Sequence, residues 1–205
     1  MFREILTKEQ TELLNFIKEF KRNFYLVGGT AIALQVGHRR SIDFDMFSSK
    51  PLNLKLIGDK FYKKNIKIGR IFLRTQEQYT LNSNSVQITF FHYPYKIPHD
   101  IKFENYLTMP ALLDLAAMKA FALGRRAKWK DYVDLYFVMK YYHPLKEITK
   151  RANELFNDEF SAKLFRGQIS YFEDIDYEEE VIYLNKPIDK DEIKKYLVNT
   201  ATEKF

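Results

Sequence analysis

The chain is 205 residues long and 46% hydrophobic, which is enough to bury a sizeable core as one compact unit or as two small lobes. It contains no cysteine, which excludes disulfide bonds and thiolate metal sites and is typical of a protein from a reducing cytoplasm. The first residues lack the pattern of a signal peptide, and no stretch of about 18 consecutive apolar residues occurs. We therefore expect a soluble, cytoplasmic protein without membrane contact.

Charge is distributed unevenly along the chain. Residues 173–205 contain ten acidic and five basic side chains, so residues 1–172 contain 28 basic and 17 acidic ones and carry a net charge of +11. This excess favours a polyanion as partner, although solvated lysines alone would give the same composition. The acidic run at residues 173–180 (EDIDYEEE) is most simply a solvated loop, and covering a basic groove is the second interpretation.

Hydrophobic periodicity predicts strands and helices up to residue 107 and helices only from Pro110 onward. The expected helices of the first half are Lys8–Lys21, Thr30–Val36 and Leu54–Lys64. The expected strands are Phe24–Val27, Ser41–Phe47, Ile66–Arg74, Tyr79–Leu81, Val86–Phe91 and Ile101–Phe103, the last completing a mixed sheet. This pattern predicts a two-lobed α/β (α+β) protein, with a mixed-sheet lobe at residues 1–107 and an all-helical lobe at residues 108–205.

Two aspartates stand one residue apart in the second expected strand. Side chains alternate along a strand at roughly 3.3 Å per residue, so Asp43 and Asp45 share a face about 7 Å apart, while Ile42, Phe44 and Met46 point into the core. Two carboxylates on one strand face suit Mg²⁺, which prefers a few carboxylate oxygens together with substrate phosphates and waters. Taken alone, such a pair is more often a solvated strand edge.

A glycine turn precedes these acids. Gly28, Gly29 and Thr30 stand between a strand and a helix, where free N–H groups and the helix dipole favour a phosphate and glycine lets a ligand approach the backbone. A lone Gly-Gly is usually only a tight turn. Together, the turn and the acids predict a site for a nucleoside triphosphate with magnesium.

Charged residues of the second half form another candidate group. Lys119 falls within an apolar helical stripe, where a buried ammonium needs an anionic partner unless the side chain reaches solvent. Lys128, Asp131 and Asp134 recur three residues apart and so lie near one helix face, close after Arg125 and Arg126. As charges on the surface of an amphipathic helix they would have no function.

The order of these motifs resembles the signature of the DNA polymerase β-like nucleotidyltransferase superfamily: Gly-Gly-Thr, thirteen residues from Thr30 to Ile42, then Asp43 and Asp45. The fuller string GGTAIAL…GHRRSIDFDMF is similar to the AbiEii/AbiGii toxin family of abortive-infection and toxin–antitoxin systems. That family's second-half motif, a lysine on one helix and K-x-x-D-x-x-D on the next, resembles Lys119 followed by residues 128–134. The resemblance covers roughly residues 24–138.

The resemblance implies a nucleotidyltransferase fold and an Mg²⁺-dependent enzyme that transfers a nucleoside monophosphate from a nucleoside triphosphate to an acceptor hydroxyl. The acceptor implied is RNA, for instance a tRNA 3′ end, and the role implied is growth arrest neutralised by an antitoxin protein. The residues implied are Asp43 and Asp45 as metal ligands, Asp43, Asp45, Lys119 and Asp131 as catalytic residues, and Gly28, Gly29, Thr30, Ser41, Lys119, Lys128 and Asp134 as nucleotide-binding residues.

One position departs from the superfamily pattern. A third carboxylate is usual on a later strand, and here Thr89 stands where it is expected. Asp100 or Glu104 could replace it, or the base could be dispensable, since positioning and metal charge dominate phosphoryl transfer. Two alternative functions therefore stay open: a degenerate module that binds nucleotide or RNA without turnover, and a metal-dependent glycosyltransferase, whose D-x-D motif does not normally follow a glycine turn at this spacing.

Overall fold

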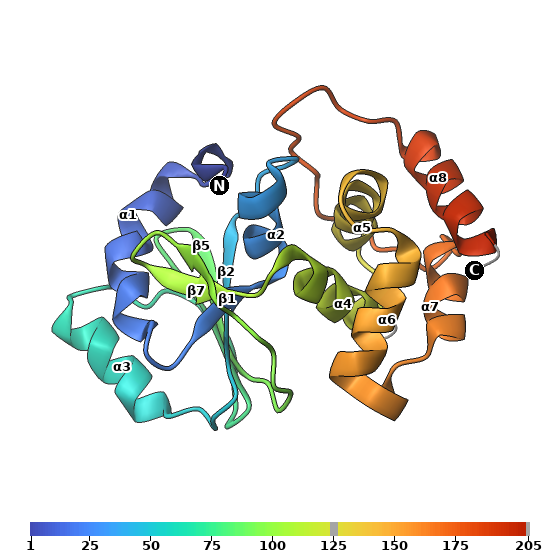
Figure 1. Ribbon diagram of the computed structural model, residues 1–205. Coiled ribbons are helices and arrows are strands. Elements are labelled where there is room, and N and C mark those ends of the chain that lie inside the picture. Colours follow the sequence, from blue (N-terminus) through green and yellow to red (C-terminus); the bar gives the residue numbers. More distant parts are fainter. Residues whose placement is uncertain (124–126, 204–205) are drawn as a thin grey trace.

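The computed structural model describes residues 1–123 and 127–203 and has a mixed α/β architecture. Strands and helices of the first half of the chain form one side of the molecule, and helices alone form the other (Figure 1). The strands are β1 (Tyr25–Val27), β2 (Asp43–Ser48), β3 (Ile71–Arg74), β4 (Gln78–Ser83), β5 (Val86–His92), β6 (Ile101–Phe103) and β7 (Leu107–Met109). The α-helices are α1 (Lys8–Ile17), α2 (Gly28–Val36), α3 (Leu54–Lys63), α4 (Leu112–Leu123), α5 (Trp129–Tyr141), α6 (Leu145–Phe156), α7 (Ala162–Ile169) and α8 (Lys190–Thr202), with 3₁₀ turns at η1 (Arg3–Ile5), η2 (Lys18–Phe20) and η3 (Asn157–Glu159).

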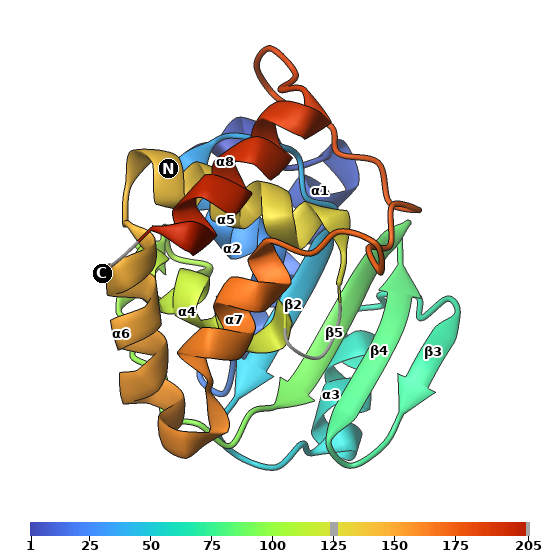
Figure 2. The same cartoon turned by 90° about the vertical axis from the view of Figure 1, so that its right-hand side faces the viewer.

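The main sheet has the strand order β1-β2-β5-β4-β3 and is mixed, as the sequence predicts. β2 runs parallel to β5, whereas the other neighbouring pairs are antiparallel. Figure 2 shows β2, β5, β4 and β3 side by side in this order. The expectation that Ile101–Phe103 completes this sheet is wrong, because β6 pairs with β7 in a separate two-stranded sheet.

An aromatic cluster holds α1, η2 and α3 against one face of the main sheet. The rings of Phe16 and Phe61 lie 4.5 Å apart, and that of Phe20 lies 4.8 Å from Phe90 on β5. These side chains are almost completely buried. Burial of several aromatic side chains, each worth about 1.5–3 kcal/mol, fixes the strand β5 and its neighbour β2.

Helices α2, α4 and α5 join the sheet to the helical side of the molecule. α2 contacts β1 and β2 on one side and α4 and α5 on the other. Gln35 of α2 also donates a hydrogen bond to the Pro110 carbonyl ahead of α4, at 3.0 Å. The core of the helical side includes the stacked rings of Phe121 and Phe156, 4.1 Å apart. The division of the chain at residue 107 stays a prediction, since these contacts cross it.

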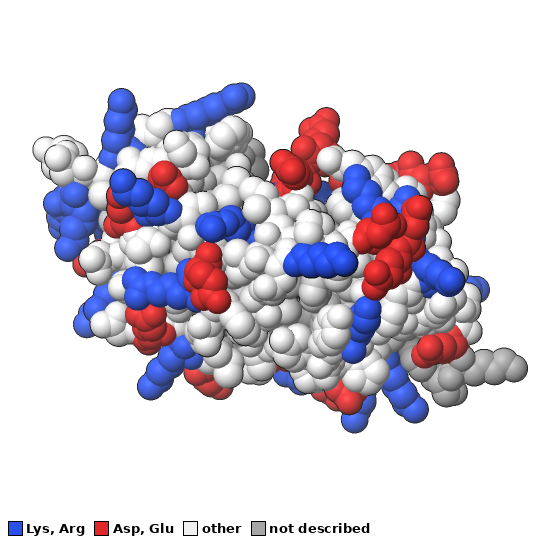
Figure 3. Space-filling view, turned by 90° about the horizontal axis from the view of Figure 1, so that it is seen from above, with Lys and Arg blue, Asp and Glu red and all other residues white. Residues whose placement is uncertain are grey.

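On the face seen in Figure 3, Lys and Arg side chains (blue) and Asp and Glu side chains (red) are interspersed. Among the described helices, none combines the length and the apolar character needed to cross a membrane.

Candidate active site

The two aspartates of β2 lie where the strand pattern predicts them. Asp43 and Asp45 are half-buried on one face of the strand, and Phe44 and Met46 on the other face are completely buried. Ile42 precedes the strand and is 45% exposed, so its expected position in the core is wrong. The carboxylates therefore stand on a rigid, packed strand at the margin between core and solvent.

The glycine turn lies directly against one of these carboxylates. Gly28 has φ +71°, and a Cβ atom there would lie 2.1 Å from Asp45 Oδ2. The helix α2 begins at Gly28, two residues before the predicted start at Thr30, and Val27 pairs with Asp45 across β1 and β2. Only glycine allows this approach, so the turn and the Asp45 carboxylate are in direct contact, and their joint role in binding a nucleotide stays a prediction.

The other residues of the turn have intramolecular partners. A Cβ atom on Gly29 would lie 2.6 Å from Arg39 Nη2 and 3.1 Å from Ser41 Oγ. The Thr30 hydroxyl donates to the Asp43 carbonyl at 2.5 Å and lies 3.0 Å from Ser41 Oγ. These contacts position β2 relative to α2, and the proposed phosphate contacts of Gly29, Thr30 and Ser41 stay predictions.

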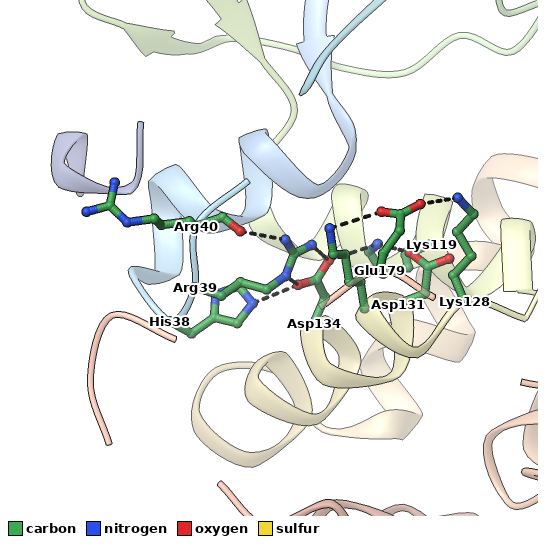
Figure 4. A network of polar contacts seen from close by, with 9 residues as sticks. His38, Arg39, Arg40, Lys119, Lys128, Asp131, Asp134 and Glu179 are labelled. Atoms are coloured by element: carbon green, nitrogen blue, oxygen red, sulfur yellow. Dashed lines mark hydrogen bonds and ion pairs between the residues drawn. The ribbon is translucent and has the colours of Figure 1, made fainter. Parts of the chain in front are cut away.

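A buried ion cluster surrounds Asp134 of α5 (Figure 4). Arg39 binds both oxygens of this carboxylate, with Nε at 2.7 Å from Oδ1 and Nη2 at 2.9 Å from Oδ2. His38 Nε2 lies 2.7 Å from Oδ1, and Lys119 Nζ lies 2.9 Å from Oδ2. Asp134 is fully buried. Its carboxylate thus has three partners: His38 and Arg39 from the connection between α2 and β2, and Lys119 from α4.

The charge state of this cluster follows from its surroundings. Burial alone would raise the pKa of Asp134, but Arg39 and Lys119 outweigh it and hold that pKa well below its usual range. Burial lowers the pKa of His38, although Asp134 opposes the shift. We therefore assign an ionised Asp134 paired with two permanent cations and a neutral His38.

Lys119 of α4 also contacts a second aspartate. Its Nζ lies 2.5 Å from Asp131 Oδ1, and both side chains are 6% exposed. Burial alone would lower the pKa of Lys119, but Asp131 and Asp134 outweigh it and raise the pKa. The expected anionic partner of this lysine is thus present within the protein, and a contact between Lys119 and a triphosphate stays a prediction.

Two lysines at the start of α5 meet a glutamate from far along the chain. Lys128 and Lys130 both pair with Glu179, the latter at 2.9 Å. The expectation that residues 173–180 are only a solvated loop is therefore wrong for Glu179. Sequence reasoning missed Lys130 and Glu179 in the site, although the acidic run itself was the available signal. Arg125 and Arg126, which precede Lys128, lie outside the described residues.

These lysines and Glu179 act on one of the two β2 acids, Asp43. Burial is the main cause that raises the pKa of Asp43, the charge of Glu179 raises it further, and Lys130 and Lys128 oppose the shift. The charges of Lys128, Lys130 and Glu179 therefore act electrostatically on Asp43.

The position opposite Asp45 on the parallel neighbour β5 is occupied by Thr89. Its hydroxyl lies 3.4 Å from that of Thr80 on β4. The β5 strand, VQITFFH, contains no carboxylate. Of the two substitutes considered, Glu104 pairs with Arg3 at 3.4 Å, and a role for Asp100 stays a prediction. The departure from the three-acid pattern is thus located beside Asp45.

The donor set fits a hard divalent cation that shares its ligands with a substrate. Within residues 1–123 and 127–203, no three His, Asp or Glu side chains are gathered so that they alone could hold a metal. Asp43 and Asp45 supply two carboxylates, and the absence of a side chain at Gly28 lets the Asp45 carboxylate lie against the start of α2. Mg²⁺ commonly takes one or two carboxylates and completes its shell with phosphates and waters, so the residues fit this ion.

The architecture places the chain among proteins with a nucleotidyltransferase fold. MenT4, a nucleotidyltransferase toxin from Mycobacterium tuberculosis, superimposes with a TM-score of 0.64 and 12% identity over 95% of this chain and 82% of its own. JHP933 from Helicobacter pylori gives a TM-score of 0.56 at 18% identity, over 96% and 91% of the two chains. A candidate nucleotidyltransferase from H. pylori gives 0.57 at 18% identity, over 94% and 91%.

A sequence relative defines the family more narrowly. The chain is 32% identical over 209 residues to the uncharacterized protein aq_aa25 of Aquifex aeolicus, covering 95% of this chain and 98% of the relative. The chain therefore belongs to the same family as aq_aa25. No family model matches the sequence.

Proposed function

We propose that this protein is an Mg²⁺-dependent nucleotidyltransferase of the AbiEii/AbiGii type, which transfers a nucleoside monophosphate from a nucleoside triphosphate to a hydroxyl of RNA. The observation that carries this proposal is the contact between the glycine turn and the strand acids. Gly28, at the first turn of α2, lies against Asp45, and Asp43 stands on the same face of β2. A nucleotidyltransferase needs a phosphate-binding turn beside a pair of metal-binding carboxylates.

The chemistry is a displacement at the α-phosphorus. The acceptor oxygen forms a bond to this atom, the bond from it to the bridging oxygen of the β-phosphate breaks, and pyrophosphate leaves with that bond's electron pair. The proton of the acceptor hydroxyl passes to a base or to water. When bound by Asp43 and Asp45, Mg²⁺ supplies Lewis-acid stabilisation of the charge that develops on the phosphate oxygens.

The protein's own residues orient the reactants. The N–H groups at Gly29 and Thr30, at the start of α2, point donors toward the triphosphate. Lys128, at the start of α5, supplies positive charge to it, and Asp131 and Asp134 keep Lys119 charged and fixed beside the site. Positioning and charge provide most of the rate in phosphoryl transfer, so Thr89 in place of a third acid is compatible with turnover.

The acceptor and the biological role follow from the same proposal. A net charge of +11 over residues 1–172 suits an RNA acceptor such as a tRNA 3′ end. The toxin MenT4 shares this fold, and its name describes a nucleotidyltransferase toxin. We assign this protein a corresponding role in growth arrest, with a cognate antitoxin as its protein partner, and we place it in the cytoplasm.

The competing function is a degenerate module that binds nucleotide without turnover, and Thr89 is the observation that favours it. Incubation of the purified protein with each α-labelled nucleoside triphosphate, Mg²⁺ and total RNA distinguishes the two. We expect label in the RNA, and its loss when EDTA is added or both β2 aspartates are replaced by alanine. Nucleotide binding with no label transfer from any of the four substrates would establish the degenerate module instead.

A further inference from the structure

Glu179, in the chain between α7 and α8, bridges two lysines with its two carboxylate oxygens. Oε1 accepts a hydrogen bond from Lys128 Nζ, and Oε2 lies 2.9 Å from Lys130 Nζ. Burial alone would raise the pKa of Glu179, but hydrogen bonds from the two lysines outweigh it and lower that pKa to about 2. An ionised carboxylate between two ammonium groups makes the kind of contact that two oxygens of a phosphate group would make.

The segment that carries Glu179 is attached on both sides of the candidate active site. At its start, the Asp176 N–H donates to the Ala127 carbonyl at 2.8 Å, and the Trp129 N–H donates to the Asp176 carbonyl at 3.0 Å. At its end, the Arg40 N–H donates to the Ile182 carbonyl at 2.8 Å. Residues 177–181, which we call the acidic strap, therefore span from the start of α5 to the connection between α2 and β2.

Glu179 can be displaced from the lysines without unfolding the protein. Its side chain is 41% exposed, and those of Lys128 and Lys130 are 39% and 18% exposed. Ion pairs this accessible to water contribute little to stability. The backbone attachments at residues 176 and 182 do not depend on the Glu179 side chain, so this side chain can turn away while the strap stays in place.

Glu179 also adds negative charge to a site that already has two acids. A triphosphate that approaches Asp43 would meet this charge and would find the two lysines already neutralised. Figure 4 shows Glu179 joined by dashed lines to Lys128 and to a second amine, which is that of Lys130.

We propose that Lys128 and Lys130 form a polyphosphate-binding site and that Glu179 occupies it as an intramolecular competitor, which the triphosphate of the substrate must displace. The identity of the anion as a nucleoside triphosphate rests on the proposed function. Lys130 then becomes a further binding residue of the site. The acidic strap sets the nucleotide concentration at which the site fills, because each binding event has to break the Glu179 contacts.

The test measures binding of inorganic tripolyphosphate without metal, so that it does not depend on nucleotide transfer. Isothermal titration calorimetry compares the wild type with Glu179→Gln, which keeps the side chain's size and removes its charge. We expect about tenfold tighter binding by E179Q, a change that corresponds to about 1.4 kcal/mol. Glu178→Gln is the matched control, because it removes the same charge from the neighbouring position, and it should change the affinity by less than about twofold at moderate salt.

A double variant separates competition from a general charge effect. Lys130→Gln should weaken binding more in the E179Q background than in the wild type, where Glu179 already occupies this lysine. Equal affinity of the wild type and E179Q, an equal gain in E178Q, or no binding by any variant would each overturn the proposal. A gain specific to E179Q, in a protein that never transfers a nucleotide to RNA, would leave this binding site standing and refute the proposed enzymatic function.

Discussion

Gly28 and Asp45 are packed so closely that the smallest side chain at position 28 would overlap the Asp45 carboxylate. A Cβ atom would lie 2.1 Å from Oδ2 and 3.0 Å from Cγ, and the backbone at Gly28 has φ +71°. Glycine is therefore required here both by the left-handed conformation and by the space. The contact fixes where the Asp45 carboxylate stands relative to the start of α2.

Gly28→Ala should displace Asp45 and abolish nucleotide transfer. The left-handed conformation costs alanine about 1–2 kcal/mol, so thermal unfolding should also detect a lower stability. Gly58→Ala is the control, because a Cβ atom at Gly58, within α3, meets no atom within 4 Å. That substitution should keep full activity and raise the stability by about 0.5–1 kcal/mol. Full transfer activity in G28A would contradict the proposed role of the turn.

Asp43→Asn and Asp45→Asn should each abolish Mg²⁺-dependent transfer while the protein stays folded. Because burial raises the pKa of Asp43, its ionisation at neutral pH costs folding free energy, and D43N should melt at a higher temperature than the wild type at pH 7. The difference should vanish as the pH falls below the unfolded-state pKa, near the usual aspartate value of 3.8, where the carboxyl is protonated in both states. Undiminished turnover in the folded double variant would refute the metal site.

Burial of His38 should make the stability of the protein depend on pH below neutrality. Because burial lowers its pKa below 6.5, the unfolded state binds a proton before the folded state does. The free energy of unfolding should therefore be unaffected by His38 above about pH 6.5 and should fall as the pH drops below it, by at most about 1.4 kcal/mol per pH unit. Urea unfolding at several pH values gives the free energy of unfolding as a function of pH. This free energy should fall less steeply with decreasing pH for His38→Gln than for the wild type.

Much of the fold and part of the site could be predicted from local sequence. Alternation along β2 placed Asp43 and Asp45 on one face, and the apolar stripe of α4 indicated that Lys119 needs an anion. Both are consequences of periodicity within a single element. The sequence also located Thr89 correctly, since the register of β2 and β5 places it opposite Asp45.

Contacts between distant segments could not be predicted in this way. Arg39 lies 95 residues from Asp134, and Glu179 lies 51 residues from Lys128. No periodic signal connects such pairs, so the cation that neutralises Asp134 and the acid that covers the lysines emerged only from the fold. The same reason explains the error for β6, because its short sequence Ile-Lys-Phe does not specify which strand it pairs with.

Lys119→Met tests whether the helical side of the molecule supplies a residue to the active site or only supports it. Lys119 Nζ lies 2.5 Å from Asp131 and 2.9 Å from Asp134, and the Lys119 side chain is 6% exposed. Removal of one partner from a buried ion pair costs about 3–5 kcal/mol, so we expect a large loss of stability. Lys140→Met, which breaks a more exposed pair with Glu192, should cost no more than about 1 kcal/mol.

The role of Lys119 in binding is measured separately, at a temperature where the K119M variant is still folded. If Lys119 contacts the triphosphate, Mg²⁺ and nucleoside triphosphate should raise the melting temperature of the wild type and of K140M but not of K119M. Should K119M melt much lower yet keep the full shift with ligand, Lys119 is a structural partner of Asp131 and Asp134, and the triphosphate-binding charge comes from the lysines at the start of α5. A stability equal to that of the wild type would instead contradict the buried ion pair itself.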